Sequence, residues 1–197
     1  MRPMHIDDWY IPFRQDDVIL RDALASMTAV QAPQGDIPLM VQLVENPRYR
    51  IPGLSIFHGA VDLAQHDFIH IILGRGVRAK DEAFTIGFTM GSTKRVSTSE
   101  EDLYAAISRY LYPGIYKFTE DDILVFRDAV RLGFISECAG LDELDFEPWL
   151  DWPLRDIREQ INLEKDLLLA YFAIEKKRFP DAIESQRLLD ETGPSSS

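Results

Sequence analysis

Apolar residues recur at helical spacing along nearly the whole chain, and this periodicity restricts the fold more than any other feature. Residues 16–30 place Val18, Leu24 and Met27 near one stripe, and two acids come first, where the helix dipole favours negative charge. No segment shows the sustained period-two alternation, bounded by hairpin turns, that indicates a β-sheet. We therefore expect an all-α single domain of about six or seven helices.

Capping and breaking residues mark the ends of further helices. Thr119 is a candidate N-cap with Asp122 at the capping-box position, and Gly133 is expected just after the end of that helix. Residues 136–153 are acidic and punctuated by prolines, so we expect a loop that packs two tryptophans, Trp149 and Trp152, against the helices. The other expected helices are residues 37–46, about 58–73, 99–112 and a long one from Pro153, at position N1, to just before Pro180.

The length and composition limit the functional class. A chain of 197 residues fits one domain, which we place at residues 1–184, with residues 185–197 as a peripheral, flexible tail. The net charge of −12 argues against a nucleic-acid partner. Cys138 is the single cysteine, which excludes a disulfide framework and a thiolate zinc cluster and fits a reducing compartment.

The sequence also bears on location. The first residues lack the apolar stretch of a secretory signal, and no apolar run approaches the roughly 18 residues that span a bilayer. We therefore expect a cytoplasmic protein without a signal peptide or transmembrane helix. Peripheral binding to a membrane surface is left open, because local basic patches matter more there than net charge.

Chemistry is concentrated in residues 66–84, which contain two of the four histidines. If this segment begins as a helix, His66 and His70 are four residues apart and lie one turn apart on one face. Asp67 can reach the same point from the flank, and Glu82 follows a turn long enough to bring the next helix back. Two imidazoles and two carboxylates suit Zn²⁺, Fe²⁺ or Mn²⁺, so we predict a divalent metal site on a helical hairpin.

The competing interpretation is an amphipathic helix whose polar face carries these residues without a ligand. Asp67, the returning Glu82 and one earlier residue, Asp62, favour the metal. His58 and Asp62 continue the four-residue spacing back from His66, so Asp62 would orient a metal-bound imidazole as an outer carboxylate partner. His58 is a second candidate partner, although its position also suits a helix start.

A ligand-binding surface is a further hypothesis. Gly87 and Gly91 are four residues apart among aromatic side chains, and glycine inside a helix costs about 1 kcal/mol relative to alanine. Close helix packing is the favoured explanation, and a groove where a ligand approaches the backbone is the alternative. The groove hypothesis includes Phe84 and Phe88 as walls. Basic side chains around the hairpin, Arg75 and Arg78 among them, are either a solvated rim or together a receptor for a carboxylate or phosphate head group.

The pattern His66-Asp67-x-x-His70, followed by eleven residues and Glu82, resembles the metal motif of the Coq-four family of coenzyme Q (ubiquinone) biosynthesis proteins. General likeness extends from about residue 44 to residue 189. The resemblance implies an all-α fold that binds a divalent metal, usually zinc, through these four residues. It also implies a channel for a prenyl lipid or prenylated quinone precursor, peripheral membrane association, and contact with other quinone-biosynthesis proteins.

Two main functional hypotheses follow from the resemblance. The first is a metal-dependent enzyme that carries out oxidative decarboxylation at ring carbon C1 of a prenylated 4-hydroxybenzoate-type substrate. The second is a non-catalytic lipid-binding scaffold that organises a quinone-biosynthesis complex. A soluble helical protein with a vestigial site is the third alternative, and the sequence leaves open whether the protein is a homodimer.

Overall fold

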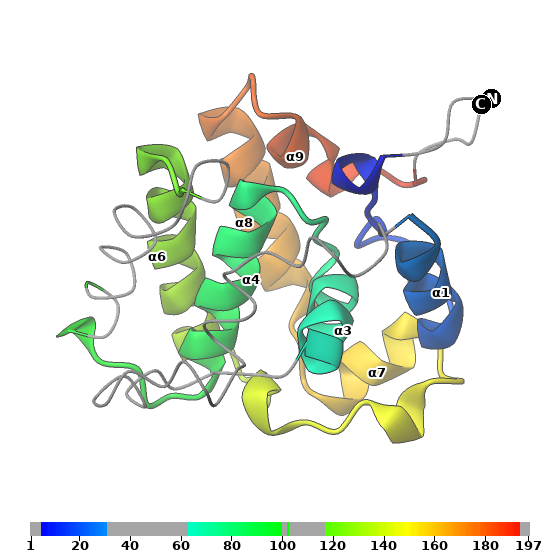
Figure 1. The fold of residues 1–197 in the computed structure, drawn as a ribbon. Coiled ribbons are helices and arrows are strands. Elements are labelled where there is room, and N and C mark those ends of the chain that lie inside the picture. Colours follow the sequence, from blue (N-terminus) through cyan, green and yellow to red (C-terminus); the bar gives the residue numbers. More distant parts are fainter. Residues whose placement is uncertain (1–4, 31–62, 100–101, 103–116, 194–197) are drawn as a thin grey trace, which may run out of the picture.

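The computed structural model describes residues 5–30, 63–99, 102 and 117–193 (Figure 1). Within these ranges the chain forms seven α-helices, short 3-10 turns and no strand, which confirms the predicted all-α class. The helices predicted at residues 37–46 and, almost entirely, 99–112 lie outside the described ranges. The α-helices are α1 (Leu20–Val30), α3 (Leu63–Leu73), α4 (Ala79–Ser92), α6 (Glu120–Ile135), α7 (Leu154–Gln160), α8 (Lys165–Arg178) and α9 (Ile183–Gln186).

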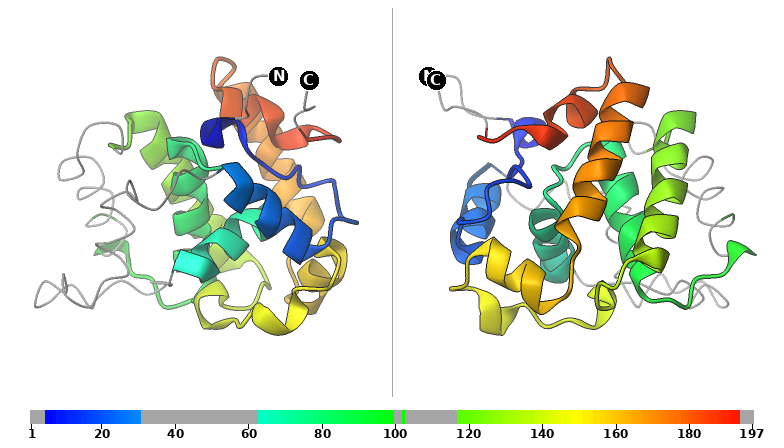
Figure 2. Two further views of the ribbon diagram at one scale, coloured as in Figure 1. Left: turned by 45° about the vertical axis from the view of Figure 1, so that its right-hand side comes forward. Right: turned by 180° about the vertical axis from the view of Figure 1, so that it is seen from behind.

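Helices α4 and α6 lie side by side and pack backbone against backbone (Figure 2). A Cβ atom added at Gly87 would lie 2.4 Å from the carbonyl oxygen of Phe126, and one added at Gly91 would lie 2.1 Å from that of Val130. Real Cβ contacts are not this short, so the two glycines allow a helix approach that a larger residue would prevent. The structure thus favours helix packing over a ligand groove for both glycines.

The third glycine of this contact corrects a predicted helix end. Gly133 was expected just after the helix, yet α6 continues to Ile135. A Cβ atom at Gly133 would lie 2.4 Å from the carbonyl oxygen of Phe88 on α4. Gly133 therefore serves the same close helix contact, and no local pattern distinguishes that role from a helix terminus.

The start of α6 is capped as predicted. The Thr119 hydroxyl accepts a hydrogen bond from the Asp122 backbone N–H at 3.2 Å, and the Asp122 carboxylate accepts one from the Thr119 N–H at 2.8 Å. The Asp122 carboxylate also pairs with Lys80 of α4 at 2.9 Å, and both side chains are buried. The same acid therefore caps α6 and joins it to the beginning of α4.

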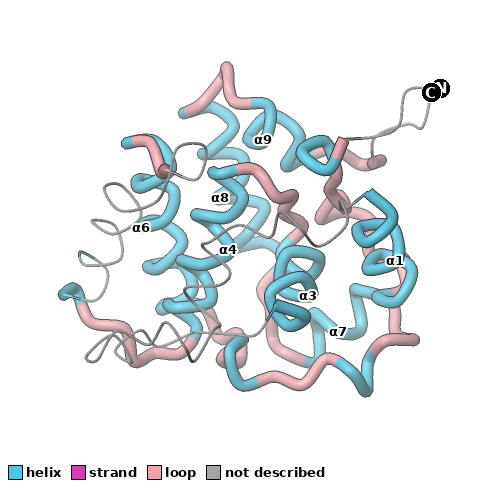
Figure 3. The backbone as a smooth tube through the Cα atoms, in the orientation of Figure 1, coloured by secondary structure: helices cyan, strands magenta, loops and turns pink. Residues whose placement is uncertain are grey.

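The single long helix predicted from Pro153 to the residues before Pro180 is wrong. The chain forms α7 and α8 instead, with a loop between them (Figure 3). Pro153 precedes α7 as its N-cap rather than occupying N1. Asn162 in the connection has a φ of +56°, a left-handed conformation that asparagine adopts more readily than most residues. The break lets Ile161 and Leu163 turn into the core, where both are buried.

Residues after position 184 also differ from the prediction. Ser185, Arg187 and Leu188 are buried, so the segment from residue 185 is part of the packed domain as far as the 3-10 turn Arg187–Leu189. The N-terminal segment lies against it, because the Tyr10 hydroxyl donates to the Asp190 carboxylate at 3.0 Å.

The segment 136–153 covers the helices largely as expected. It contains two short 3-10 turns, Leu141–Glu143 and Glu147–Trp149, and Trp149 packs against the buried Phe146 with ring centroids 5.8 Å apart. Trp152 remains 38% exposed, so it is a peripheral member of this packing. In the part of the chain that the structure describes, no helix has the length and apolarity to traverse a bilayer.

Candidate metal centre

A short, tightly constrained connection joins the two helices of the site. Gly74 follows α3 with a φ of +66°, and a Cβ atom there would lie 2.7 Å from the Cβ atom of Phe13. Glycine fits this position because it adopts left-handed φ values without a steric penalty and has no side chain. The chain then passes Gly76, where a Cβ atom would lie 2.6 Å from the carbonyl oxygen of Trp9, and enters α4 after Arg78. This connection sets the position of α4 relative to α3.

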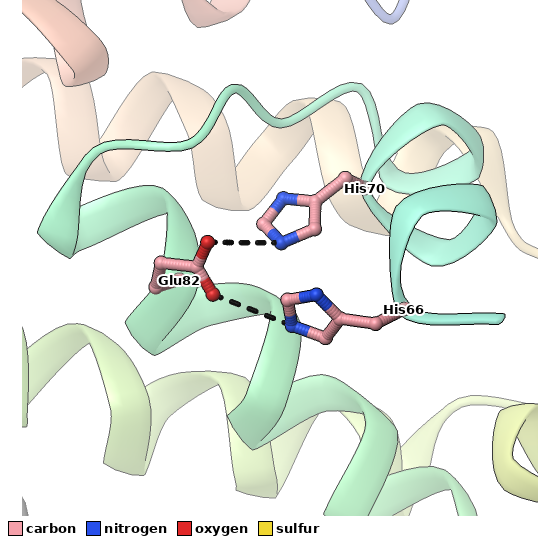
Figure 4. Close-up of side chains that lie close together, drawn as sticks. All are labelled: His66, His70 and Glu82. Atoms are coloured by element: carbon pink, nitrogen blue, oxygen red, sulfur yellow. Dashed lines mark ion pairs between the residues drawn. The ribbon is translucent and has the colours of Figure 1, made fainter. Parts of the chain in front are cut away.

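The connection brings His66 and His70 of α3 opposite Glu82 of α4 (Figure 4). The Glu82 carboxylate lies beside the two rings and turns one oxygen atom toward each of them. Its Oε2 atom is 3.3 Å from the His66 Nε2 atom, and its Oε1 atom is 3.3 Å from the His70 Nε2 atom. The imidazole centroids are 4.5 Å apart. One ligand atom from each residue lies within 4.8 Å of the others, so this group can hold a metal ion.

These separations suit a small divalent ion. Zinc bonds of about 2.0–2.2 Å in tetrahedral geometry place neighbouring ligand atoms about 3.4 Å apart. The two nitrogen–oxygen distances of 3.3 Å are close to that value, and each involves a different oxygen of the Glu82 carboxylate. The His70 Nε2 atom is also fully buried and makes no hydrogen bond of acceptable geometry, although Glu82 is near. A buried nitrogen in this state fits a metal ligand better than a hydrogen-bond donor.

The charges of the three side chains shift the pKa values of Glu82 and His70 in opposite directions. Burial raises the pKa of the Glu82 carboxyl, but the charges of His70 and His66 more than offset this and hold that pKa well below its usual range. Burial likewise lowers the pKa of His70, while attraction to Glu82, Asp67 and Asp81 outweighs it and leaves the pKa raised. In the metal-free protein the Glu82 carboxylate therefore favours a proton on His70, and a metal ion at Nε2 would replace that proton as the positive charge facing the carboxylate.

Asp67 is the predicted ligand that the structure does not bring into this group. It is partly buried and close enough to influence His70 electrostatically, but it is not among the three residues whose ligand atoms converge. Neighbouring residues on a helix point about 100° apart, so Asp67 leaves the face that His66 and His70 share. His58 and Asp62, the predicted outer partners, lie outside the described residues.

The head-group residues of the groove hypothesis are engaged elsewhere. Arg75 is fully buried and donates two hydrogen bonds to Glu175 of α8, at 3.0 and 2.6 Å. Arg78 donates to the carbonyl oxygen of Asp7 at 2.8 Å and to the Asp8 carboxylate at 3.0 Å. Both arginines thus tie the α3–α4 connection to other parts of the fold.

The aromatic walls of that groove are core side chains. Phe84 and Phe88 are fully buried, with ring centroids 5.9 Å apart. Phe84 also stacks on Tyr171 at 5.4 Å and lies under the Arg75 guanidinium at 3.8 Å. The described residues therefore place this aromatic pair inside the helix packing.

Comparison with known proteins identifies no relative. No family model matches the chain, and neither the curated proteins nor the solved structures include a significant match. The interpretation of the site therefore depends on its geometry and on the spacing of its residues.

Sequence reasoning missed one contact of the site. The Thr85 hydroxyl oxygen lies 3.3 Å from the His70 Nδ1 atom, and both side chains are fully buried. Thr85 is three residues after Glu82 and shares its face of α4. The three-residue spacing from Glu82, a predicted metal ligand, was the feature of the sequence that could have indicated Thr85 as a member of the site.

Proposed function

We propose that this chain binds one divalent metal ion through His66, His70 and Glu82. The observation that carries the proposal is the convergence of ligand atoms from three residues on two helices, with each imidazole Nε2 atom 3.3 Å from an oxygen of the Glu82 carboxylate. Nitrogen and carboxylate donors without thiolates favour Zn²⁺, with Fe²⁺ and Mn²⁺ as alternatives. Asp67 is a candidate fourth ligand, which would require its side chain to rotate toward the ion.

The surroundings support a site that accepts an external ligand. His70 is fully buried, whereas the side chains of His66 and Glu82 are 16% and 24% exposed, so the approach lies on their side. With His66, His70 and Glu82 as its only protein ligands, a divalent ion keeps one net positive charge, which favours an anionic oxygen ligand. This oxygen and Asp67 are alternatives for the fourth position. When bound, the ion supplies Lewis-acid polarisation of that oxygen.

We propose a prenylated aromatic acid as this ligand, because the spacing of the metal residues resembles the Coq-four motif. Its ring carboxylate or phenolate is the anionic oxygen that the charge of the site favours. The finer proposal is oxidative decarboxylation of the ring. In that reaction the aromatic acid, O₂, two electrons and two protons give a phenol, CO₂ and water. These two electrons must come from an external donor of the reduced-flavin or nicotinamide class whichever metal is bound. Zinc has no redox chemistry, so a zinc ion could not itself pass them to O₂.

Metal analysis tests the first step of this proposal. We expect one equivalent of zinc per chain in wild-type protein after dialysis against Zn²⁺ and gel filtration. Glu82→Gln and His70→Gln preserve side-chain size and remove a ligand, so both should lose most of the metal. His5→Gln is the matched control, because His5 is an exposed histidine outside the group. Equal metal content in all four proteins would refute the assignment of the ligands.

A scaffold without catalytic activity is the second candidate, and the state of the arginines favours it. Arg75 and Arg78 are both engaged by protein oxygen atoms, so neither is poised to hold a substrate carboxylate. The two functions separate in one experiment with metal-loaded protein, a prenylated 4-hydroxybenzoate, O₂ and reduced flavin. Formation of the decarboxylated phenol by wild-type but not by Glu82→Gln supports the enzyme. Binding of the same compound without turnover supports the scaffold.

A further inference from the structure

In the described residues of α4 and its C-cap Thr93, every serine and threonine hydroxyl except that of Thr85 donates to the helix backbone. The hydroxyls of Thr89, Ser92 and Thr93 each donate a hydrogen bond at 2.8 Å to a carbonyl oxygen three or four residues earlier in the helix. This is the usual way in which serine and threonine are satisfied in a helix. The Thr85 hydroxyl instead contacts His70 on α3 at 3.3 Å.

The contact between Thr85 and His70 is buried away from the surface. The side chains of Thr85 and His70 are both fully buried. The two imidazole nitrogens of His70 face different partners, because Nε2 points at Glu82 while Nδ1 points at Thr85. Loss of the hydroxyl would therefore leave Nδ1 buried without a partner, and an unpaired buried polar group is costly.

From this geometry we propose that Thr85 is a positioning residue that reserves the His70 Nε2 atom for the metal. This inference rests on the proposed function. A neutral imidazole can bind a metal through Nε2 only if its proton resides on Nδ1, and the partner of Nδ1 decides how well that tautomer is accommodated. Metal-bound histidines commonly donate this second N–H to an oxygen, which also fixes the ring orientation. Thr85 supplies that oxygen.

A hydroxyl suits the position better than a carbonyl would. Without metal, the His70 Nε2–H can face the Glu82 carboxylate, and the Thr85 hydroxyl then donates to Nδ1. With metal bound at Nε2, the direction reverses, and Nδ1–H donates to the Thr85 oxygen. A hydroxyl serves both states because it is donor and acceptor at once. The buried nitrogen therefore keeps a partner throughout metal binding and release.

Three variants on one helix test the inference. Thr85→Val keeps the shape of the side chain and removes the hydroxyl, and we expect the zinc dissociation constant to rise about 10- to 100-fold, as is typical for loss of an outer-shell partner. Thr85→Ser retains a hydroxyl and should restore affinity to within about threefold of wild type. Thr89→Val is the matched control, since Thr89 is equally buried on α4 but its hydroxyl bonds to the helix backbone. It should bind zinc as wild type does.

A second measurement requires only wild-type protein and remains decisive if Thr85→Val fails to fold. In zinc-loaded protein, ¹⁵N NMR of the His70 ring should show Nδ1 carrying the proton, with that proton shifted downfield by a hydrogen bond. Protonation of Nε2, or metal at Nδ1, would overturn the inference.

The zinc affinities distinguish failure of the proposed metal site from failure of the proposed role of Thr85. If wild type and Thr89→Val bind no zinc, the proposed function fails, and the role of Thr85 fails with it. If both bind zinc and Thr85→Val binds it equally well, only the role of Thr85 is refuted. If Thr85→Val and Thr89→Val lose affinity alike, the effect is structural and the inference is also refuted.

Discussion

Replacing Gly91 by alanine should separate the two central helices. The added Cβ atom would lie 2.1 Å from the Val130 carbonyl oxygen and 2.9 Å from the Phe134 nitrogen. Both are backbone atoms of α6, so no side-chain rotation can relieve the overlap. The helices must move apart by about 1 Å or more to restore ordinary contact, and that loosens every neighbouring contact between them.

The expected magnitude follows from two opposing effects. Overpacking in a well-packed core costs about 1–3 kcal/mol, and a clash with backbone belongs at the upper end of that range. Alanine recovers about 1 kcal/mol of helix propensity relative to glycine. The free energy of unfolding should therefore fall by about 2 kcal/mol, which lowers the melting temperature by about 4–8 °C in a chain of this size.

Urea unfolding followed by far-ultraviolet circular dichroism measures this change. Gly140→Ala is the matched control, because the nearest atom to its added Cβ is the flexible Asp142 side chain at 3.2 Å, and the next lies at 3.8 Å. Gly140 has a φ of −59°, which alanine adopts freely, so this variant should be neutral or more stable by up to about 1 kcal/mol.

One result would refute the packing argument. If Gly91→Ala is as stable as wild type but no longer retains a co-purifying lipid, the glycine lines a ligand groove and does not mediate helix contact. If both glycine variants lose stability equally, the effect does not come from the α4–α6 contact.

Three further predictions concern buried groups. Arg75→Met should lower the free energy of unfolding, measured in urea, by about 3–5 kcal/mol, because it leaves the buried Glu175 carboxylate without its cationic partner. The double variant Arg75→Met/Glu175→Leu removes that carboxylate as well and should recover part of the lost stability. Burial raises the pKa of the Cys138 thiol to about 12. Native protein should therefore react with iodoacetamide at pH 8 far more slowly than urea-unfolded protein does. Equal reaction rates would show that the thiol is accessible in the native protein. Zinc must displace the proton of His70, and Glu82 holds the pKa of that imidazole above its ordinary 6.5. Competition titrations should therefore show zinc affinity falling as pH decreases, beginning above pH 6.5. A zinc affinity independent of pH between 5.5 and 8 would contradict this.

The stability of the metal-free protein should follow the opposite trend. The raised pKa of His70 contributes stability that is complete below pH 6.5 and is lost as pH rises through the folded-state value. The lowered pKa of Glu82 contributes stability above pH 4.5 that is lost only at lower pH. The pair therefore stabilises metal-free protein most between about pH 4.5 and 6.5, whereas added zinc should raise the melting temperature most above that window.

Patterns among residues close in the sequence were sufficient to predict part of this structure. The four-residue spacing of His66 and His70 depends only on helix geometry, and Thr119 with Asp122 forms a cap within a single turn. Glu82 could be added because the segment before it has a length suited to a returning helix. These features involve residues that are close in the sequence or joined by one short connection.

The remaining features depend on partners that are distant in the sequence. Arg75 finds Glu175 after 100 residues, and Gly91 is explained only by Val130 on another helix. The break at Asn162 reflects the burial of side chains on both sides of it, which helix periodicity does not encode. Such pairings follow from tertiary packing, so a single sequence identifies the residues without indicating what they contact.

Anomalous X-ray diffraction from crystals of zinc-replete protein tests the central claim most directly. We predict one strong peak at the zinc absorption edge, about 2.0–2.2 Å from the Nε2 atoms of His66 and His70 and from one carboxylate oxygen of Glu82. Absence of a peak between α3 and α4, or zinc bound only by other side chains, would contradict the account.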